Sequence, residues 1–144
     1  MKLLLLAQAA ATLFMVGLIW MVQVVHYPLF DRVERNDFAR FEADHQRLTT
    51  WVVAPPMLVE LLTAVWLLGQ RPHEVPAWSA WLGVVLVAVI WLSTIFAQVP
   101  QHNVLAHGFD EAAYRILVGT NWLRTVAWSV RGVLVLGMLG RVMR

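Results

Sequence analysis

Four long apolar runs with few charges constrain this chain more than any other feature of its sequence. They cover residues 3–25, 48–69, 78–99 and 114–139. A helix of about 20 apolar residues crosses the roughly 30 Å hydrocarbon core of a bilayer. Because the core contains no water, each crossing must satisfy its own backbone groups, as a helix does. The sequence therefore predicts an all-α integral membrane protein, a four-helix transmembrane bundle in one domain over residues 1–144.

The composition agrees with a membrane protein and excludes several other classes. Charged residues make up 14% of the chain, against roughly 25% in soluble domains. The net charge of +2 is spread without a basic tract, so we expect no nucleic-acid partner. There is no cysteine, which excludes disulfides and thiolate metal ligands.

The first two crossings are joined by the longest connection, residues 26–47. Within it, Phe38, Phe41 and His45 recur at helical spacing. This pattern predicts an interfacial helix that leads into the second crossing. The other connections, residues 70–77 and 100–113, are short.

The distribution of charge bears on the orientation in the membrane. An even number of crossings places both termini on one side, together with the second connection. The basic residues Lys2, Arg71, Arg141 and Arg144 lie there with one acid, Glu74, and the opposite side carries five arginines with seven acids. Only Lys and Arg count in the positive-inside rule, and they are nearly balanced. We expect both termini in the cytoplasm.

Each predicted helix carries its polar residues on one face. At about 100° per residue, the polar positions of each run cluster into a single stripe. The stripes contain Gln8, Thr12, Gln23 and His26; Glu42, His45, Thr49, Glu60 and Thr63; Thr94, Gln98 and His102; and Tyr114, Asn121, Thr125 and Trp128. Polar groups facing lipid are costly, so these stripes should face the bundle interior.

Three histidines from different helices should meet at one end of that interior. His26 ends the first helix, His45 begins the second and His102 follows the third. Glu42 precedes His45 by three residues, the Glu-x-x-His spacing that places two metal ligands on one helical face. Three imidazoles and one carboxylate suit Fe, Cu or Zn. A b-type haem between two histidines, or interfacial histidines bonded to loop carbonyls, are the alternatives.

A second polar group is expected deeper in the bundle. At 1.5 Å per residue, Glu60 lies about 18 Å below the histidine side, Arg124 about 12 Å and Arg131 about 22 Å. Charges at such depth are expected to pair, and one acid against two arginines leaves a positive surplus. With Asn121, this group would either hold a substrate or move protons, or else form an ion pair that fixes helix register.

Two segments resemble a known family. "PQHNVL" follows the third crossing, and "NWLRTVAW" lies in the fourth. Through Pro100, Asn103, Asn121 and Arg124, the chain resembles the anthrone-oxygenase-like family of small four-helix membrane proteins, and above all a bacterial branch. The resemblance implies oxidation of an aromatic or otherwise hydrophobic substrate with oxygen, in the bacterial inner membrane. It specifies no cofactor, and a reaction without one stays open.

These observations lead to two hypotheses about function. The first is a metal-dependent oxidoreductase of oxygenase type, with a His/Glu site near the non-cytoplasmic helix ends and a lipophilic substrate that enters from the bilayer. Its catalytic residues would be Glu60, Asn121 and Arg124. The second is a non-enzymatic accessory or assembly subunit of a larger respiratory or photosynthetic complex, with or without haem. Either protein could form homo-oligomers.

Overall fold

The chain forms four long helical rods and no strand, as the apolar runs predict. The computed structural model describes residues 1–144. Its elements are α1 (Lys2–Met21), η1 (Val22–His26) and α2 (Tyr27–Phe30) in the first rod; α3 (Phe38–Gly69); α4 (Ala77–Ser93), η2 (Thr94–Gln98) and α5 (Val99–Leu105) in the third; and α6 (Glu111–Val142). All four rods are long and apolar enough to cross a membrane.

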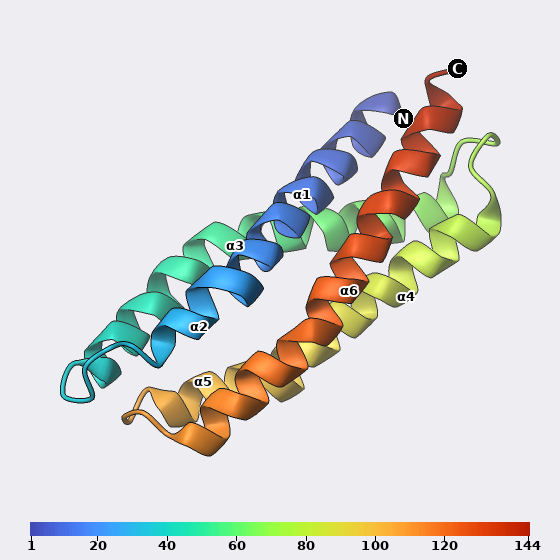
Figure 1. Cartoon of the computed structure of the whole chain (residues 1–144). Coiled ribbons are helices and arrows are strands. Elements are labelled where there is room, and N and C mark those ends of the chain that lie inside the picture. Colours follow the sequence, from blue (N-terminus) through green and yellow to red (C-terminus); the bar gives the residue numbers. More distant parts are fainter.

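The rods pack as one bundle with both termini at the same end (Figure 1). Helix α6 packs against α1 and α4, and α3 packs against the same two helices. At the opposite end, α2 and α3 diverge from α5 and α6 (Figure 1). An aromatic core that includes Tyr27, Phe30 and Phe38 fills the space between them. Packed aromatic side chains therefore close the polar interior of the bundle at this end.

The segment before the second crossing differs from the prediction. It is no separate interfacial helix, because α3 runs without a break through 32 residues. Phe38, Glu42 and His45 are buried on the same helical face that later carries Glu60. One continuous buried face needs one continuous helix, so the interfacial segment and the crossing are a single element.

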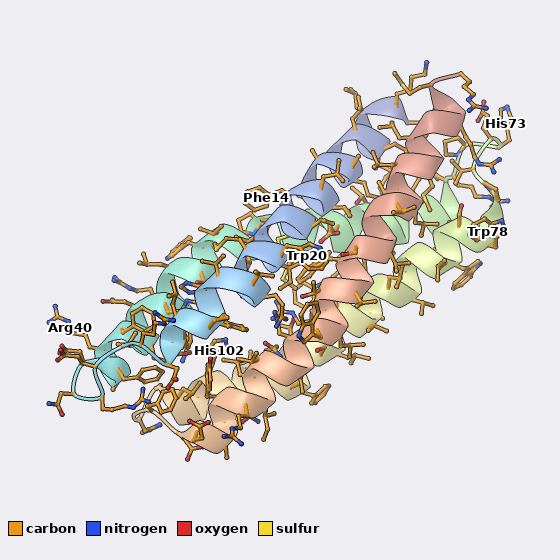
Figure 2. The ribbon with its side chains drawn as sticks, viewed as in Figure 1. Phe14, Trp20, Arg40, His73, Trp78 and His102 are labelled. Atoms are coloured by element: carbon orange, nitrogen blue, oxygen red, sulfur yellow. The ribbon has the colours of Figure 1, made fainter.

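The polar stripes face the interior, and many large apolar side chains are exposed on the outer surface. Trp51, Phe96 and Val133 are 77%, 74% and 74% exposed, as expected of lipid-facing positions. The buried polar and charged residues are Gln8, Thr12, Gln23, Glu42, His45, Glu60, Thr63, Ser79, Ser93, Gln98, Asn121, Arg124, Thr125 and Arg131. Most of them belong to the stripes predicted from helical periodicity. The side chains in Figure 2 project around the whole length of the bundle.

Two π-helical turns interrupt the first and third rods, and each is followed by a proline. Residues Val22–His26 precede Pro28, and Thr94–Gln98 precede Pro100. Proline removes one backbone N–H and crowds the carbonyl four residues before it. A π turn widens the helix at that point, and such turns are frequent at functional sites. Both turns lie at the level of the polar residues near the histidine end.

A buried ion pair connects the four rods in the middle of the bundle. Glu60 Oε1 accepts hydrogen bonds from Arg131 Nε at 2.9 Å and from Thr12 Oγ1 at 2.7 Å. Trp128 Nε1 donates to the other oxygen at 2.9 Å, and Arg131 Nη1 donates to the Gly83 carbonyl at 2.8 Å. The expected pairing of Glu60 therefore occurs with Arg131 alone.

Replacing Arg131 by methionine should destabilise the bundle strongly. The change leaves the Glu60 carboxylate buried without its partner, which costs about 3–5 kcal/mol for ion pairs of this kind. Arg141→Met, at an exposed position of the same helix, is the matched control. Unfolding by SDS in mixed micelles measures both. The double variant Glu60→Gln, Arg131→Met should recover part of the loss, and equal stability of the two single variants would contradict the assignment.

Candidate metal site

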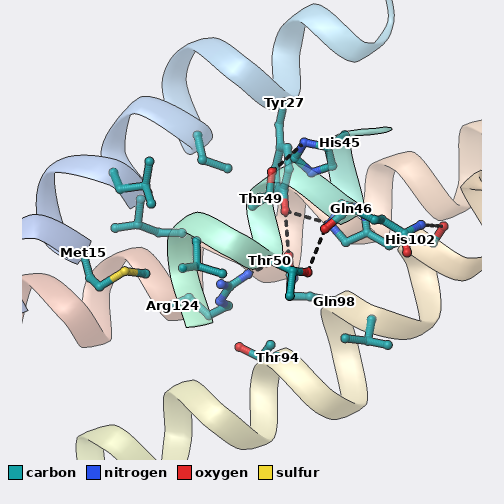
Figure 3. Close-up of a pocket in the computed structure, with 15 residues that line it drawn as sticks. Met15, Tyr27, His45, Gln46, Thr49, Thr50, Thr94, Gln98, His102 and Arg124 are labelled. Atoms are coloured by element: carbon teal, nitrogen blue, oxygen red, sulfur yellow. Dashed lines mark hydrogen bonds between the residues drawn. The ribbon is translucent and has the colours of Figure 1, made fainter. Parts of the chain in front are cut away.

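Glu42, His45 and His102 come together at the end of the bundle opposite the termini, where α2 and α3 diverge from α5 and α6 (Figure 1). Each offers one ligand atom, and these atoms all lie within 4.8 Å of one another. Glu42 and His45 lie one turn apart on α3, and His102 comes from α5. Figure 3 shows the His45 and His102 rings on the two sides of the same space. Two imidazoles and one carboxylate form a set of donors that could hold a metal ion.

Hydrogen bonds fix the orientation of His102. Its Nδ1 lies 2.6 Å from Glu42 Oε1, and because an ionised carboxylate only accepts, Nδ1 carries the proton. Its Nε2 lies 3.1 Å from the hydroxyl of Tyr27. Gln46 Nε2 donates both to Glu42 Oε1 at 3.1 Å and to the His102 carbonyl at 2.9 Å. Both ring nitrogens of His102 therefore lie within hydrogen-bond distance of side chains of the protein.

Two potential ligand atoms have no partner in the protein. Glu42 Oε2 is buried and makes no hydrogen bond. His45 uses Nδ1 for contacts with His26 Nε2 at 2.9 Å and Thr49 Oγ1 at 3.1 Å, which leaves its Nε2 free. Buried polar atoms are nearly always satisfied in folded proteins, so an orphaned carboxylate oxygen calls for an ion or another donor. A cation between Glu42 and His45 would meet that need.

His26 does not join the ligand group as the sequence predicted. Its Nε2 contacts His45 instead, and its ring packs edge-on against Phe30 at 5.2 Å between centroids. A group that bonds the second nitrogen of a ligating histidine fixes the orientation of that ring. His26 is therefore a positioning residue for His45.

A cavity of about 150 Å³ adjoins the ligand group (Figure 3). His45, His102 and Arg124 lie in its polar wall, and the remaining lining residues are Met15, Leu18, Ile19, Val22, Tyr27, Gln46, Thr49, Thr50, Val53, Thr94, Gln98 and Val99. Thr50 on α3 and Val99 on α5 are also exposed on the outer surface. The cavity therefore extends toward the lipid-facing side of the bundle between these two helices.

Of the three predicted catalytic residues, only Arg124 lines this cavity. Its Nη1 donates to Gln98 Oε1 and to Asn121 Oδ1, both at 3.3 Å. Asn121 is fully buried and donates to Gln23 Oε1 at 2.8 Å. This bond fixes the Asn121 amide, whose oxygen accepts from Arg124. Glu60 is held in the ion pair with Arg131 and is not part of the cavity wall. The structure thus separates Glu60 from the site.

Three residues of the site were not predicted as site residues, although Gln98 was placed on an inward polar face. Tyr27, Gln98 and Gln46 connect the ligand group to Arg124 or to the backbone, since Gln98 Oε1 accepts from both Tyr27 and Arg124. For Tyr27 and Gln98, a nearby proline was the sequence feature that could have drawn attention to them. Tyr27 directly precedes Pro28, and Gln98 lies two residues before Pro100.

Models of known protein families, curated proteins and solved structures were compared with the chain, and none matches. The resemblance to the anthrone-oxygenase-like family therefore remains a hypothesis, based on Pro100, Asn103, Asn121 and Arg124.

Replacing His26 by phenylalanine should weaken metal binding without removing a ligand. The change keeps a ring against Phe30 and removes the nitrogen that orients His45. Loss of such an outer partner typically lowers metal affinity about 10–100-fold. Competition with a chelator of known affinity measures the effect, and His107→Phe, at a loop position, is the control. Equal affinity of the two variants would show that His26 does not position His45.

Proposed function

We propose that this protein is a membrane-embedded, metal-dependent oxidoreductase of oxygenase type that acts on a lipophilic substrate. The observation that carries the proposal is the meeting of Glu42, His45 and His102 beside a cavity that reaches the lipid-facing surface. Two histidines and one carboxylate that leave coordination positions open are typical of non-haem Fe(II) oxygenases. As part of the same proposal, the protein lies in the bacterial inner membrane with both termini in the cytoplasm.

The donor group fits a transition-metal ion with little rearrangement. Bonds from nitrogen or oxygen to such metals are about 2.0–2.2 Å long, so two ligand atoms on one ion are at most about 4.4 Å apart. The observed limit of 4.8 Å requires only a small closure. A ligating imidazole nitrogen must be unprotonated, so His102 would bind an ion through Nδ1 in the tautomer that has its proton on Nε2, next to the Tyr27 hydroxyl.

The protein's own groups supply binding, orientation and exclusion of water. Glu42 provides a negative charge that balances part of the charge of a divalent cation. Gln46 and His26 hold the ligands in place. The apolar residues of the cavity wall, such as Met15 and Ile19, place hydrocarbon next to the ligand group and keep water out.

The reaction class is oxidation of a C–H bond by dioxygen. When bound, an iron ion would supply the binding and reduction of dioxygen. Conversion of a methylene group to a carbonyl breaks two C–H bonds, consumes one O₂ and releases one water, so this stoichiometry needs no other reductant. Dioxygen is apolar and reaches the cavity through the same lipid-facing side as the substrate.

The arrangement gives little support to a haem between two of the histidines. The rings of His26 and His45 are 4.7 Å apart between centroids and directly hydrogen-bonded. The rings of His45 and His102 are 5.2 Å apart. A porphyrin placed between either pair would have to displace the contacts that hold the rings.

Removing a ligand should remove the metal from the purified protein. We expect stoichiometric iron, copper or zinc in the wild type by elemental analysis and strong depletion in His45→Ala and Glu42→Gln. His73→Ala, on the opposite side of the membrane, is the control. A metal-free wild type that co-purifies with large subunits would favour the accessory-subunit hypothesis.

An open coordination position can be tested with nitric oxide as a probe. Protein loaded anaerobically with Fe(II) should give the high-spin ferrous–nitrosyl EPR signal on addition of nitric oxide, because an oxygenase site leaves positions for a small molecule. His45→Ala should lose the signal. Stoichiometric iron with no nitrosyl signal would indicate a saturated, structural metal site and would contradict an oxygenase.

A further inference from the structure

The Arg124 side chain is a buried positive charge without a negative partner. It is 8% exposed, and the one buried acid in the middle of the bundle, Glu60, is paired with Arg131. No carboxylate of the protein forms a salt bridge with Arg124, whereas the exposed Arg115 on the same helix pairs with Glu111. Buried charges are expected to be paired. The protein supplies no anion for this charge, which is only partly compensated by the face of the Trp128 ring, 5.1 Å from the guanidinium carbon.

The hydrogen bonds of Arg124 are also incomplete. Its two bonds, from Nη1 to the amide oxygens of Gln98 and Asn121, are both 3.3 Å long. Nε is buried and has no partner. The nearby hydroxyl of Tyr27 is neutral and does not balance the charge. Figure 3 shows the Arg124 side chain at the wall of the cavity, so an anion that pairs with its guanidinium would occupy that cavity.

The cavity around Arg124 is amphiphilic. Its apolar lining is formed by Met15, Leu18 and Ile19 of α1 and Val53 of α3. Such a surface takes a hydrocarbon chain or ring, while Arg124 takes a charged head. Thr50 of α3 and Val99 of α5 line the cavity and are also exposed on the outer surface, so an amphiphile would enter laterally between these helices.

We infer that this cavity binds a lipophilic carboxylic acid, with its carboxylate on the guanidinium of Arg124 and its hydrocarbon against the apolar wall. The planar guanidinium matches a carboxylate in shape and charge. Arg124 is the one Lys or Arg side chain in the cavity wall, which favours a single negative charge over a phosphate dianion. The role of this acid as the substrate rests on the proposed oxidoreductase function, but its binding does not.

The position of the carboxylate would also place the rest of the molecule. Arg124 is connected to His102 through Gln98 and Tyr27, with distances of 3.3, 3.3 and 3.1 Å between successive polar atoms. His45 and His102 line the same small cavity. A carboxylate fixed at Arg124 therefore holds the carbons next to it in the cavity that the two histidines line.

The test compares dodecanoate with 1-dodecanol and dodecyl phosphate as ligands. Wild-type protein, stripped of metal with EDTA and held in a neutral detergent at mildly alkaline pH, is titrated with each by equilibrium dialysis. A charge-assisted pair of this kind should make dodecanoate bind about tenfold or more tightly than the alcohol. Arg124→Gln should remove that preference, while Arg115→Gln, at an exposed position of the same helix, should keep it.

A second variant covers the case in which Arg124→Gln does not fold. Val53→Trp fills the cavity from α3 and leaves Arg124 in place, so it should abolish dodecanoate binding. Equal affinity for acid and alcohol in the wild type, a preference that survives in Arg124→Gln, or undiminished binding in Val53→Trp would each overturn the inference. Tighter binding of dodecyl phosphate would overturn the choice of carboxylate. The protein is metal-free throughout, so these outcomes are independent of the metal experiments.

Discussion

The structure depends on how one carboxylate is satisfied where no water reaches it. Glu60 lies in the middle of the bundle, 2% exposed, and an unpaired charge there would be expelled or neutralised. Its partners come from α1 and α6, and Arg131 continues the connection to the carbonyl of Gly83 on α4. The lateral packing of apolar side chains against lipid gives little preference for one helix register over another. This network supplies that preference, and the register sets which residues meet at the histidine end.

Much of the fold and part of the site follow from the sequence because they depend on spacing alone. Hydrophobic length predicts the four crossings, and a period of 100° per residue predicts the inward polar faces. The same rule places Glu42 beside His45, and chain topology adds His102. The sequence could not predict which of Arg124 and Arg131 pairs with Glu60. Their depths lie on either side of that of Glu60, and depth does not give the direction of a side chain.

The positions near the two π turns were harder to predict for a different reason. A prediction from helical periodicity assumes the same rotation, about 100°, for every residue. The rotation per residue is smaller in a π turn, and such turns lie before Pro28 and before Pro100. The side chains beyond each turn are rotated from their expected directions. His26 consequently contacts His45 rather than the shared centre, and Tyr27 enters the bond network of His102. A proline within a transmembrane run is the sequence feature that marks such a departure.

His45 separates two hollows rather than lining one. Besides the cavity near Arg124, a groove of about 410 Å³ lies between α1 and α3, and Leu18, Val22, His45 and Thr49 border both. One hollow reaches the surface between α3 and α5, and the other lies on the α1 side of α3. The same four side chains therefore separate the two hollows, and a change in the position of the His45 ring would alter the shape of both.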